Sequence, residues 1–476
     1  MKTEILQYDL EKALEAVLAF SRETNYYGLL NTILTKMMEL TNADAGTLYV
    51  AEDEQLVFRI MKTISLNIYK GAHENIDLPP IRLDGDHIDN ISAYAAIKNE
   101  LINVDDVYED ARFNFSGPKN YDKLTGYRTK SMLAFPLSTT EGEVIGVIQL
   151  INAQDGAGAV IAFTAAFDTS VLLALASASA NALANILYAK EIDELFHSFV
   201  RVMTKAIDER SAYNVNHTNN VAKLCGAFAE YLTSQYPKGH DYHFSENRQS
   251  QLVMAAYLHD VGKIVTPLHI MDKMDRLGDQ TESLQYRFDI AALQNPGMSA
   301  KLAEAWSIIE AANTSGFMTD EKVEQIKALA DLKYIDRDGE PAPILSGQNI
   351  ESLTVRKGTL TDDERKIMQE HAAITHRLLD NMKFNKSYRH VPTWASSHHE
   401  YLDGTGYPYG LSGGEVELEM CILTIMDIYD ALTAGDRPYR RAMPSEKACE
   451  ILKSMAGEGK LHKELVTMFI ESGIGR

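Results

Sequence analysis

The stretch that most limits how this chain can fold is residues 167–207, which contain no proline and no glycine. Apolar residues recur along it at alternating spacings of three and four, and this pattern predicts one long helix. The recurring residues are Leu172, Leu175, Ala182, Ile186 and Ala189. Such a seam suits two parallel helices packed together, and a single helix lying on the core of its own domain is the alternative. In either arrangement the helix separates an N-terminal from a C-terminal part.

Length and charge limit the class of protein. The 476 residues exceed what one hydrophobic core usually organises, and 45% hydrophobic with 24% charged residues is an ordinary globular composition. The net charge of -21 argues against a protein that coats DNA or RNA, because phosphate neutralisation needs clustered Lys and Arg. The three cysteines, Cys225, Cys421 and Cys449, are an odd number without close spacing, so we expect no disulfide framework and a cytoplasmic location.

Residues 169–189 carry no charge and are the one stretch that suggests a membrane span. They contain two asparagines and many Ala and Ser, and no basic cluster flanks them. We therefore expect a buried or dimer-forming helix and no membrane association. The N-terminal residues are charged and helix-patterned, so we expect no signal peptide.

The N-terminal part predicts a small α+β domain with an antiparallel sheet. Residues 8–42 have helical periodicity, and alternating segments at 45–61 and 131–153 each predict a hairpin. This order, with "KSMLAFPL" and "GEVIGVIQLINA", resembles a GAF sensory domain over roughly residues 20–165. The resemblance implies a small-molecule ligand, sometimes a cyclic nucleotide, between the sheet and its loops, and a purely structural, dimerising GAF domain is the alternative. We assign residues 1–165 to this domain.

Residues 166–207 then form a connecting helix, through which we expect a homodimer. A ligand-dependent shift in this helix would pass from the N-terminal domain to the C-terminal one.

The segment QSQLVMAAYLHDVGK, residues 249–263, places a His and an Asp at the end of an apolar helix. Leu252, Ala255, Ala256 and His259 share one helical face, and we expect Gly262 to end the helix. Burying His259 and Asp260 unpaired would cost several kcal/mol, which a bound metal ion offsets. The carboxylate of Asp260 has two oxygens and so can bridge two metals, and Lys263 would place a cation on a substrate phosphate.

This HD pair and the later HHEYLDGTGYP resemble the two signatures of the HD-GYP family of cyclic dinucleotide phosphodiesterases, over about residues 195–476. The resemblance implies an all-α helical bundle, which we assign to residues 208–476. It implies as metal ligands His217, His259, Asp260, His371, His398, His399 and Asp427. Of these, we group His217, His259, Asp260 and Asp427 around one ion, and His371, His398 and His399 around the other with Asp260 as the bridge. It implies as catalytic residues Asp260 and Lys263, and as substrate-binding residues Lys263, Gly406, Tyr407, Pro408, Arg437 and Arg440.

Two further carboxylates and a capping box belong to the same region. Asp403 would orient a ligand imidazole without binding the metal itself, and Asp430 would cap or brace the following segment. A capping box from Thr361 to Glu364 starts the helix that carries His371. Gly404 and Gly406 allow close backbone approach or positive φ angles.

Imidazole and carboxylate ligands without thiolate suit a transition metal better than Mg or Ca. We expect two divalent ions, Fe or Mn first, with Ni, Co or Zn as alternatives. Some family members hold a third ion through a Glu one turn before the first histidine, and Tyr213 stands at that position here.

Three departures separate this chain from the family pattern. His259 and His371 lie 112 positions apart, several times the usual spacing, so we expect an inserted segment at about 273–357. Thr375 replaces a common glycine, and one extra residue precedes RPYR. Four other histidines have no matching family position, and we expect surface or supporting roles for them: His240, His243, His269 and His376.

The sequence thus predicts a sensor joined to an enzyme that hydrolyses cyclic di-GMP to pGpG, GMP or both. Hydrolysis of a mixed cyclic GMP-AMP dinucleotide is one alternative, and a noncatalytic cyclic dinucleotide-binding module is another. A diiron oxygenase on a related helical scaffold is disfavoured by the GYP loop and the RPYR segment.

Overall fold

The computed structural model describes residues 2–71, 78–163, 168–210, 216–435 and 442–475. The chain divides into two compact units, Met1–Leu195 and Phe196–Arg476, and each is described by itself.

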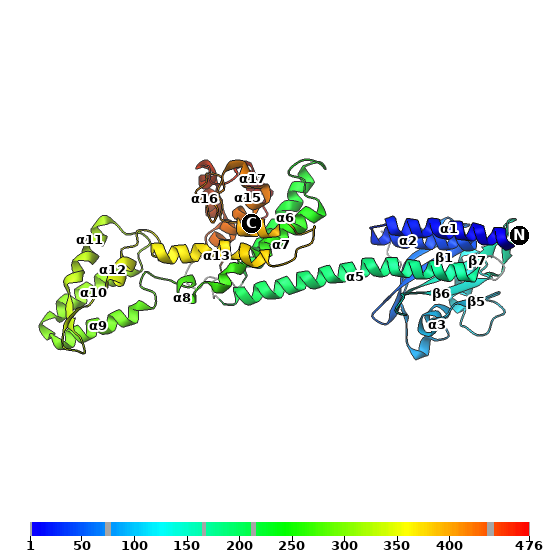
Figure 1. Cartoon of the computed structure of the whole chain (residues 1–476), viewed down its shortest axis with the longest axis horizontal. Helices are drawn as coiled ribbons and strands as arrows, with labels where there is room; N and C mark the ends of the chain where they lie inside the picture. The colour runs from blue at the N-terminus through cyan, green and yellow to red at the C-terminus, as the bar shows by residue number, and fades with distance from the viewer. Residues whose placement is uncertain (1, 72–77, 164–167, 211–215, 436–441, 476) are drawn as a thin grey trace. The chain divides into compact units, whose positions relative to one another are not determined.

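The first unit is built on an antiparallel sheet of eight strands in the order β3-β2-β1-β7-β6-β5, with β4 beside β2 and β8 beside β7 (Figure 1). The strands are Ala43–Glu52 (β1), Gln55–Thr63 (β2), Ile68–Lys70 (β3), Ile81–Arg82 (β4), Ile102–Val104 (β5), Met132–Ser138 (β6), Val144–Gln154 (β7) and Val160–Ile161 (β8). Both predicted hairpins are confirmed. Asp53 and Glu54 turn the first with positive φ angles of 47° and 59°, the conformation of tight turns whose twist matches that of the strands.

Helices cover both faces of this sheet (Figure 1). They are Lys2–Arg22 (α1), Tyr26–Thr41 (α2), Ile91–Lys98 (α3), Ser116–Thr125 (α4) and the first part of Thr169–Asp208 (α5). Because side chains alternate along a strand, Leu48 and Ile148 join the core under α1, α2 and α5. Their neighbours Tyr49 and Val147 join a second cluster with α3. The predicted α+β architecture is confirmed.

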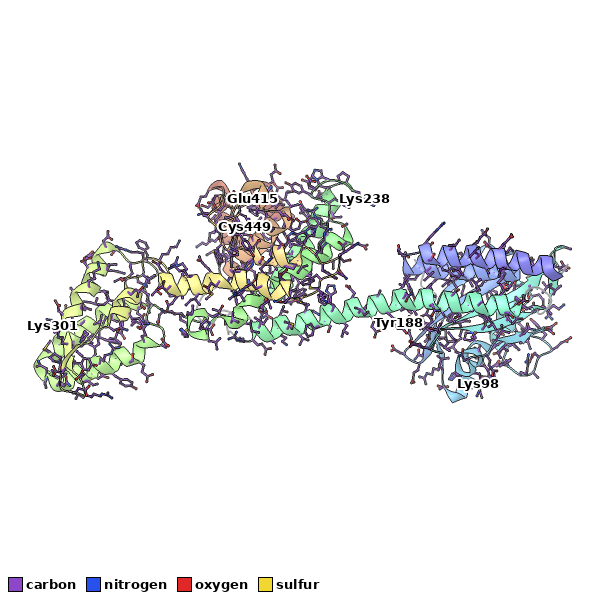
Figure 2. The ribbon with its side chains drawn as sticks, viewed as in Figure 1. Lys98, Tyr188, Lys238, Lys301, Glu415 and Cys449 are labelled. Carbon is purple, nitrogen blue, oxygen red and sulfur yellow. The ribbon has the colours of Figure 1, made fainter. Side chains whose placement is uncertain are left out.

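Helix α5 confirms the long connecting helix, but the predicted seam between two chains is wrong for its first part. Leu172 and Leu175 are 0% and 2% exposed and lie in the core of the first unit. The alternative, a helix on its own domain's core, describes this stretch, because the apolar face that would meet a second helix already covers the sheet. Further along, Tyr188 is 43% exposed, and its hydroxyl donates to Glu143 Oε2 at 2.6 Å (Figure 2).

By length and composition alone, α5 could also cross a membrane: its most apolar window has a mean hydropathy of 1.6. Core helices pass the same test, and 39% of that window is buried inside the protein. The finding is therefore weak evidence for a membrane span.

The second unit is a helical bundle, as expected. Its helices outside the inserted segment are His217–Gln235 (α6), Glu246–Leu258 (α7), Leu268–Met271 (α8), Asp362–Asp380 (α13), Val391–Ser396 (α14), Leu418–Thr433 (α15), Ser445–Gly457 (α16) and Lys463–Ser472 (α17). Helix α15 is central, with buried residues along most of its length. Helix α13 begins at the predicted capping box, in which Thr361 Oγ1 accepts from Glu364 N and Glu364 Oε2 accepts from Thr361 N.

The inserted segment has a hydrophobic cluster of its own, formed by residues from Leu277 to Leu353. Its helices are Gln280–Gln294 (α9), Ser299–Asn313 (α10), which carries Lys301 (Figure 2), Asp320–Ala328 (α11) and Gly347–Leu353 (α12). A two-stranded hairpin of Lys333–Ile335 (β9) and Pro341–Pro343 (β10) adds strands that the all-α expectation did not include. The buried amine of Lys273 joins the segment to α13, since it lies 2.7 Å from both carboxylate oxygens of Glu364.

Candidate metal centre

The His-Asp turn follows α7 directly. The α-helix ends at Leu258, and a 3-10 turn begins at Val261, so the expectation that the helix continues to Gly262 is wrong. A Cβ on Gly262 would lie 2.0 Å from the carbonyl oxygen of His371, so the missing side chain is what lets this turn pack on α13. Thr375 holds the contact: its hydroxyl accepts from Gly262 N at 3.0 Å and donates to His259 O at 2.9 Å.

Three imidazoles, His259, His371 and His398, are held in the same way. Each places Nδ1 within hydrogen-bond distance of the carbonyl oxygen three residues before it. The acceptors are Ala256 at 2.7 Å, Met368 at 2.6 Å and Ala395 at 2.6 Å. A carbonyl oxygen only accepts, so Nδ1 carries the hydrogen and the neutral ring has its lone pair on Nε2. Each ring therefore presents the atom that a metal ion binds.

Asp260 lies between two groups of imidazoles. Its Oδ2 is 3.7 Å from His217 Nε2 and 3.3 Å from His259 Nε2. Its Oδ1 is 3.3 Å from His371 Nε2 and 3.7 Å from His398 Nε2. One carboxylate oxygen thus faces each group, which is the arrangement that a bridging ligand requires.

Two buried atoms of this cluster, His259 Nε2 and Asp260 Oδ1, have no hydrogen-bond partner within the described part of the chain. Leaving such atoms unpaired is costly, and a cation bound to both removes the cost. His217, His259 and Asp260 each offer a ligand atom within 4.8 Å of the others, and so do His371, His398 and His399. The residues present therefore fit metal ions.

His217 begins α6 and lies against two carboxylates of α15. Its Nδ1 is 2.7 Å from Asp430 Oδ2, and its Nε2 is 3.1 Å from Asp427 Oδ1. Burial alone would lower the pKa of His217, but the hydrogen bonds to Asp427 and Asp430 outweigh burial and raise the pKa to about 10. Burial likewise opposes ionisation of Asp427, yet the hydrogen bond and charge of His217 hold the pKa of that carboxyl well below its usual range. Asp430 thus hydrogen-bonds directly to the predicted ligand His217. The sequence predicted only that Asp430 would cap or brace the following segment.

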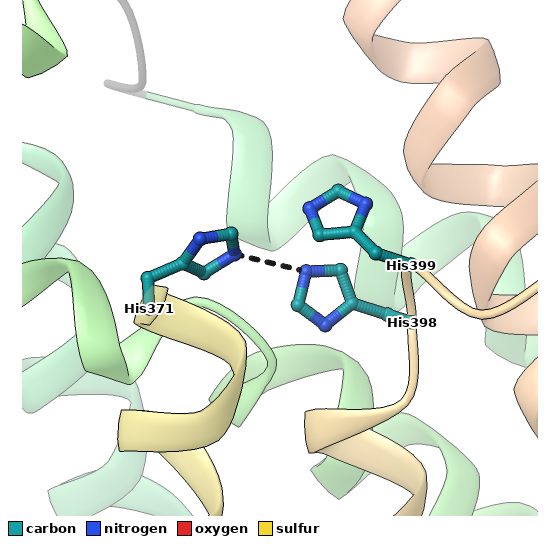
Figure 3. Close-up of side chains that lie close together, drawn as sticks. All are labelled: His371, His398 and His399. Atoms are coloured by element: carbon teal, nitrogen blue, oxygen red, sulfur yellow. Dashed lines mark hydrogen bonds between the residues drawn. The ribbon is translucent and has the colours of Figure 1, made fainter. Parts of the chain in front are cut away.

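The second group comes from α13 and from the turn after α14 (Figure 3). His371 Nε2 and His398 Nε2 are 3.3 Å apart, and His399 Nδ1 is 3.8 Å from Asp427 Oδ2. Burial lowers the pKa of His398 well below its usual range and that of His399 to about 3, so both rings stay neutral. Asp427 therefore reaches toward both groups, although the sequence assigned it to the first ion alone.

Of the predicted substrate-binding residues, Lys263 contacts Asp260, whereas Tyr407 lies beside His399. Lys263 Nζ lies 2.5 Å from Asp260 Oδ2. The ring of Tyr407, which precedes Pro408, lies 4.6 Å from that of His399, centroid to centroid. A Cβ on Gly406 would lie 2.5 Å from Glu400 Cα, which makes this a close backbone approach.

Arg437, Arg440 and Tyr213 lie outside the residues that the structure describes.

One buried carboxylate at this loop was missed from the sequence. Glu400 is 2% exposed and accepts from three backbone N–H groups, those of Tyr409, Gly410 and Leu411, at 2.6, 3.2 and 2.9 Å. It therefore shapes the loop that carries Tyr407. The sequence signal was the position of Glu400 directly after the pair His398 and His399, because a buried carboxylate there would need hydrogen-bond partners.

The role expected for Asp403 is not what the structure shows. Its carboxylate is exposed and accepts from the backbone N and the hydroxyl of Thr405, at 3.0 and 2.6 Å. These bonds close a local turn, for which Asp two residues before Thr is a typical pattern. No imidazole is among the hydrogen-bond partners described for Asp403.

The C-terminal end of α5 also contacts this centre. Asp208 is buried and accepts from the hydroxyl of Thr218, the residue after His217, at 2.7 Å. Arg210 donates to the carbonyl oxygens of Lys263, at 3.2 Å, and of Ile264. Neither contact was predicted from the sequence.

Comparisons with known proteins agree with this division of the chain. Residues 28–187 match the GAF domain family, and residues 214–337 and 347–465 match two HD domain families. The first match ends within α5, whose first part belongs to the core of the first unit.

Three curated relatives are bacterial phosphodiesterases. The chain is 43% identical over 98 residues to the 3'3'-cGAMP-specific phosphodiesterase 3 of Vibrio cholerae, covering 21% of this chain and 20% of that protein. It is 36% identical over 107 residues to the cyclic di-GMP phosphodiesterase response regulator RpfG of Xanthomonas campestris, covering 22% and 28%. It is 32% identical over 155 residues to the cyclic di-GMP phosphodiesterase of Thermotoga maritima, covering 32% and 39%.

These matches span less than half the length of each relative. At the level of domains, the structure and the family matches agree: this chain carries a GAF domain followed by an HD domain.

Proposed function

We propose that the HD domain is a metal-dependent phosphodiesterase that hydrolyses cyclic di-GMP to pGpG, GMP or both. The observation that carries this proposal is Asp260, whose two oxygens each face a separate group of imidazoles. Two of the relatives described above are named as cyclic di-GMP phosphodiesterases, which favours this substrate class.

Two ions would be held by residues of this cluster. His217, His259, Asp260 and Asp427 would hold one, and Asp260 with His371, His398 and His399 the other. Nitrogen and oxygen donors without a thiolate favour Fe or Mn, with Ni, Co or Zn as alternatives. Two metal ions, when bound, would lower the pKa of a bound water molecule and neutralise charge on a phosphoryl group.

The chain's own groups prepare this chemistry. The carbonyl oxygens of Ala256, Met368 and Ala395 keep the Nδ1 hydrogens in place, so the Nε2 lone pairs need no reorientation. Asp430 fixes the orientation of the His217 ring by accepting from its Nδ1. His259, His371 and His398 are therefore preorganised ligands, and the ring of His217 is already oriented.

Lys263 would bind the substrate phosphate. Its amine lies beside Asp260 Oδ2, among the residues that would hold the metal ions, where a positive charge would attract an anionic substrate. Tyr407 and Pro408 would form one wall of the substrate site beside His399, with Arg437 and Arg440 as further phosphate contacts. The buried Glu400 would keep this wall in position.

The GAF domain would regulate the reaction through α5 in a cytoplasmic homodimer. Tyr188, Ile192, Leu195, Phe199 and Val202 follow spacings of four and three and are 43 to 68% exposed, which suits a parallel helix pair. We assign the dimer contact to this stripe, beyond the part of α5 that covers the sheet.

A mixed cyclic GMP-AMP dinucleotide is the second candidate substrate. The 43% identity to a 3'3'-cGAMP-specific phosphodiesterase favours it. The two substrates need the same metal-binding residues and differ only in base contacts.

Metal-loaded protein incubated with each dinucleotide, followed by chromatography of the products, tests the proposal. The Asp260→Asn variant should lose both ions and turnover, whereas Asp403→Asn, a matched change at an exposed carboxylate, should keep them. Binding of a dinucleotide without turnover under any metal would support the noncatalytic alternative. Oxygen consumption in place of nucleotide products would support an oxygenase.

A further inference from the structure

The GAF domain contains a cavity of about 370 Å³, lined by the sheet, by Leu78 and Pro79, and by residues between Asn90 and Thr129. Aromatic side chains contribute much of its lining, among them Tyr49, Phe58, Phe115 and Tyr127. A cavity of about 150 Å³ accepts benzene, so this one has room for roughly two fused rings.

The described lining contains no carboxylate and one cation, Lys62. The Lys62 amine lies 3.4 Å from the hydroxyl of Thr35 on α2, and α2 belongs to the core on the opposite face of the sheet. Its charge is therefore directed away from the cavity. Enclosing a phosphate or a carboxylate among these side chains would leave a buried charge without a counterion.

Helix α3, which begins at the cavity, does not supply an anion site through its first N–H groups. Asn90 caps α3, and its Oδ1 accepts from the backbone N of Ser92 at 2.9 Å and of Ala93 at 3.1 Å. Free N–H groups at a helix N-terminus commonly bind phosphate, but these two are already occupied. At α4, which also begins at the cavity, Ser116 N donates to Asn114 Oδ1 and Pro118 has no N–H group.

Three side-chain amides line the cavity, and the oxygen of each is in use. Gln149 Oε1 accepts from Ser92 Oγ at 2.8 Å and from Tyr49 OH at 3.2 Å. Asn90 Oδ1 caps α3, and Asn114 Oδ1 accepts from Ser116 N at 3.0 Å. Their NH2 groups have no acceptor among the described residues, so the cavity offers hydrogen-bond donors to whatever enters it.

Gln149 is the best placed of the three. It stands on β7 between Val147, which belongs to the cluster on the cavity face, and Ile151, which lines the cavity itself. A polar side chain in an otherwise apolar row, held in place by hydrogen bonds to two hydroxyls, can recognise a polar atom of a ligand.

We infer that this cavity binds an uncharged, planar heteroaromatic molecule with a hydrogen-bond acceptor, recognised by Gln149, and that it excludes cyclic mononucleotides. This inference does not depend on the proposed phosphodiesterase activity, because it concerns the GAF domain alone.

Isothermal titration calorimetry on the full chain with four probes tests the inference. Coumarin has two fused rings and a carbonyl acceptor, naphthalene has the rings without the acceptor, and coumarin-3-carboxylate adds a negative charge to the first. Cyclic GMP is the fourth probe. We expect coumarin to bind about fivefold more tightly than naphthalene, the effect of one hydrogen bond, and the two anions to give no measurable heat.

The Gln149→Leu variant should bind coumarin about fivefold more weakly and naphthalene unchanged, which also reports that the cavity is intact. Gln154→Leu, on the same strand but outside the lining, is the matched control and should bind both as the natural chain does. Cyclic GMP binding as tightly as coumarin would overturn the inference. So would equal coumarin affinities in Gln149→Leu and the natural chain, or no binding of either uncharged probe at about 1 mM.

Discussion

The two domains of this chain use buried polar groups in opposite ways. In the GAF cavity the amide oxygens already have partners, and the described lining brings no free charge inward. In the HD domain, buried imidazoles and carboxylates converge, and His259 Nε2 and Asp260 Oδ1 have no partner in the described chain. A site that offers neutral N–H donors and no inward charge selects a neutral ligand, whereas a site with unpaired lone pairs on nitrogen and oxygen selects a cation.

The geometric origin of the two sites differs as well. The floor of the cavity comes from neighbouring strands, where alternation alone brings Tyr49 and Gln149 to one face. The metal-binding residues come from helix ends and turns that lie far apart in the chain, such as His217 and Asp427. The HD site therefore depends more strongly on exact packing between helices, and the following predictions test that difference.

The largest effect is expected for Gly262→Ala. The new Cβ would lie 2.0 Å from the backbone oxygen of His371, so the His-Asp turn and α13 would have to separate. We expect a loss of about 3 kcal/mol or more from the HD domain in urea unfolding, and loss of bound metal. The GAF transition should not move, and Gly414→Ala, where a Cβ meets nothing within 4 Å, should leave both transitions unchanged. An HD transition equal to that of the natural chain would refute the close packing.

Next comes Asp430→Asn, which weakens the partner of His217 Nδ1 without removing a ligand. We expect metal affinity to fall about 10- to 100-fold, measured by chelator competition. Asp403→Asn is the paired control, because that carboxylate bonds only within its own turn in the described structure. Equal affinities in the two variants would remove the distinction drawn between these carboxylates.

The stability of the metal-stripped HD domain should depend on pH. Because burial lowers the pKa of His399 to about 3, the unfolded chain binds a proton below pH 6.5 that the folded domain does not, and stability falls as pH drops. At pH 5 this amounts to roughly 2 kcal/mol at most. His217, with its pKa raised to about 10, contributes fully below pH 6.5, and its contribution is lost as pH rises toward 10. Urea unfolding should therefore show a maximum near pH 6.5, and a flat profile from pH 5 to 9 would contradict both assignments.

The smallest effect is expected for Glu400→Gln, which keeps an acceptor but removes the charge that binds three backbone N–H groups. The loop carrying Tyr407 should loosen, raising KM for the dinucleotide several-fold while kcat changes less. Glu415→Gln, at an exposed residue of the next turn, is the control. A change in metal content in place of KM would show that Glu400 supports the metal-binding residues and not the substrate wall.

Local patterns accounted for much of the fold. The capping box at Thr361, the two hairpins and the length of α5 were readable because each depends on residues only a few positions apart. The seam residues Leu172 and Leu175 show the limit of such patterns. The same spacing serves a helix pair or a helix on a sheet, and only burial distinguishes the two.

The candidate site shows the same limit. The motifs identified His259, Asp260, His398 and His399 as site residues. Asp403, which was expected to orient an imidazole, instead accepts hydrogen bonds from Thr405, two residues away. Glu400 and Gln149 gave weak signals, since a single polar residue in a short segment does not reveal whether it will be buried.

The sequence by itself determined the residue types, the helical and alternating periods and the two signatures, since these depend on side-chain chemistry and short spacings. The tertiary structure decided which oxygen of Asp260 faces which imidazole, which nitrogen of each ring is left for a metal, and that the GAF cavity is without an inward charge among its described residues. The positions of the imidazoles around Asp260 depend on contacts between segments more than a hundred residues apart, such as those of the His-Asp turn with α13. The acceptors that fix the ring hydrogens lie only three residues away, but no local pattern shows that these rings will be buried together.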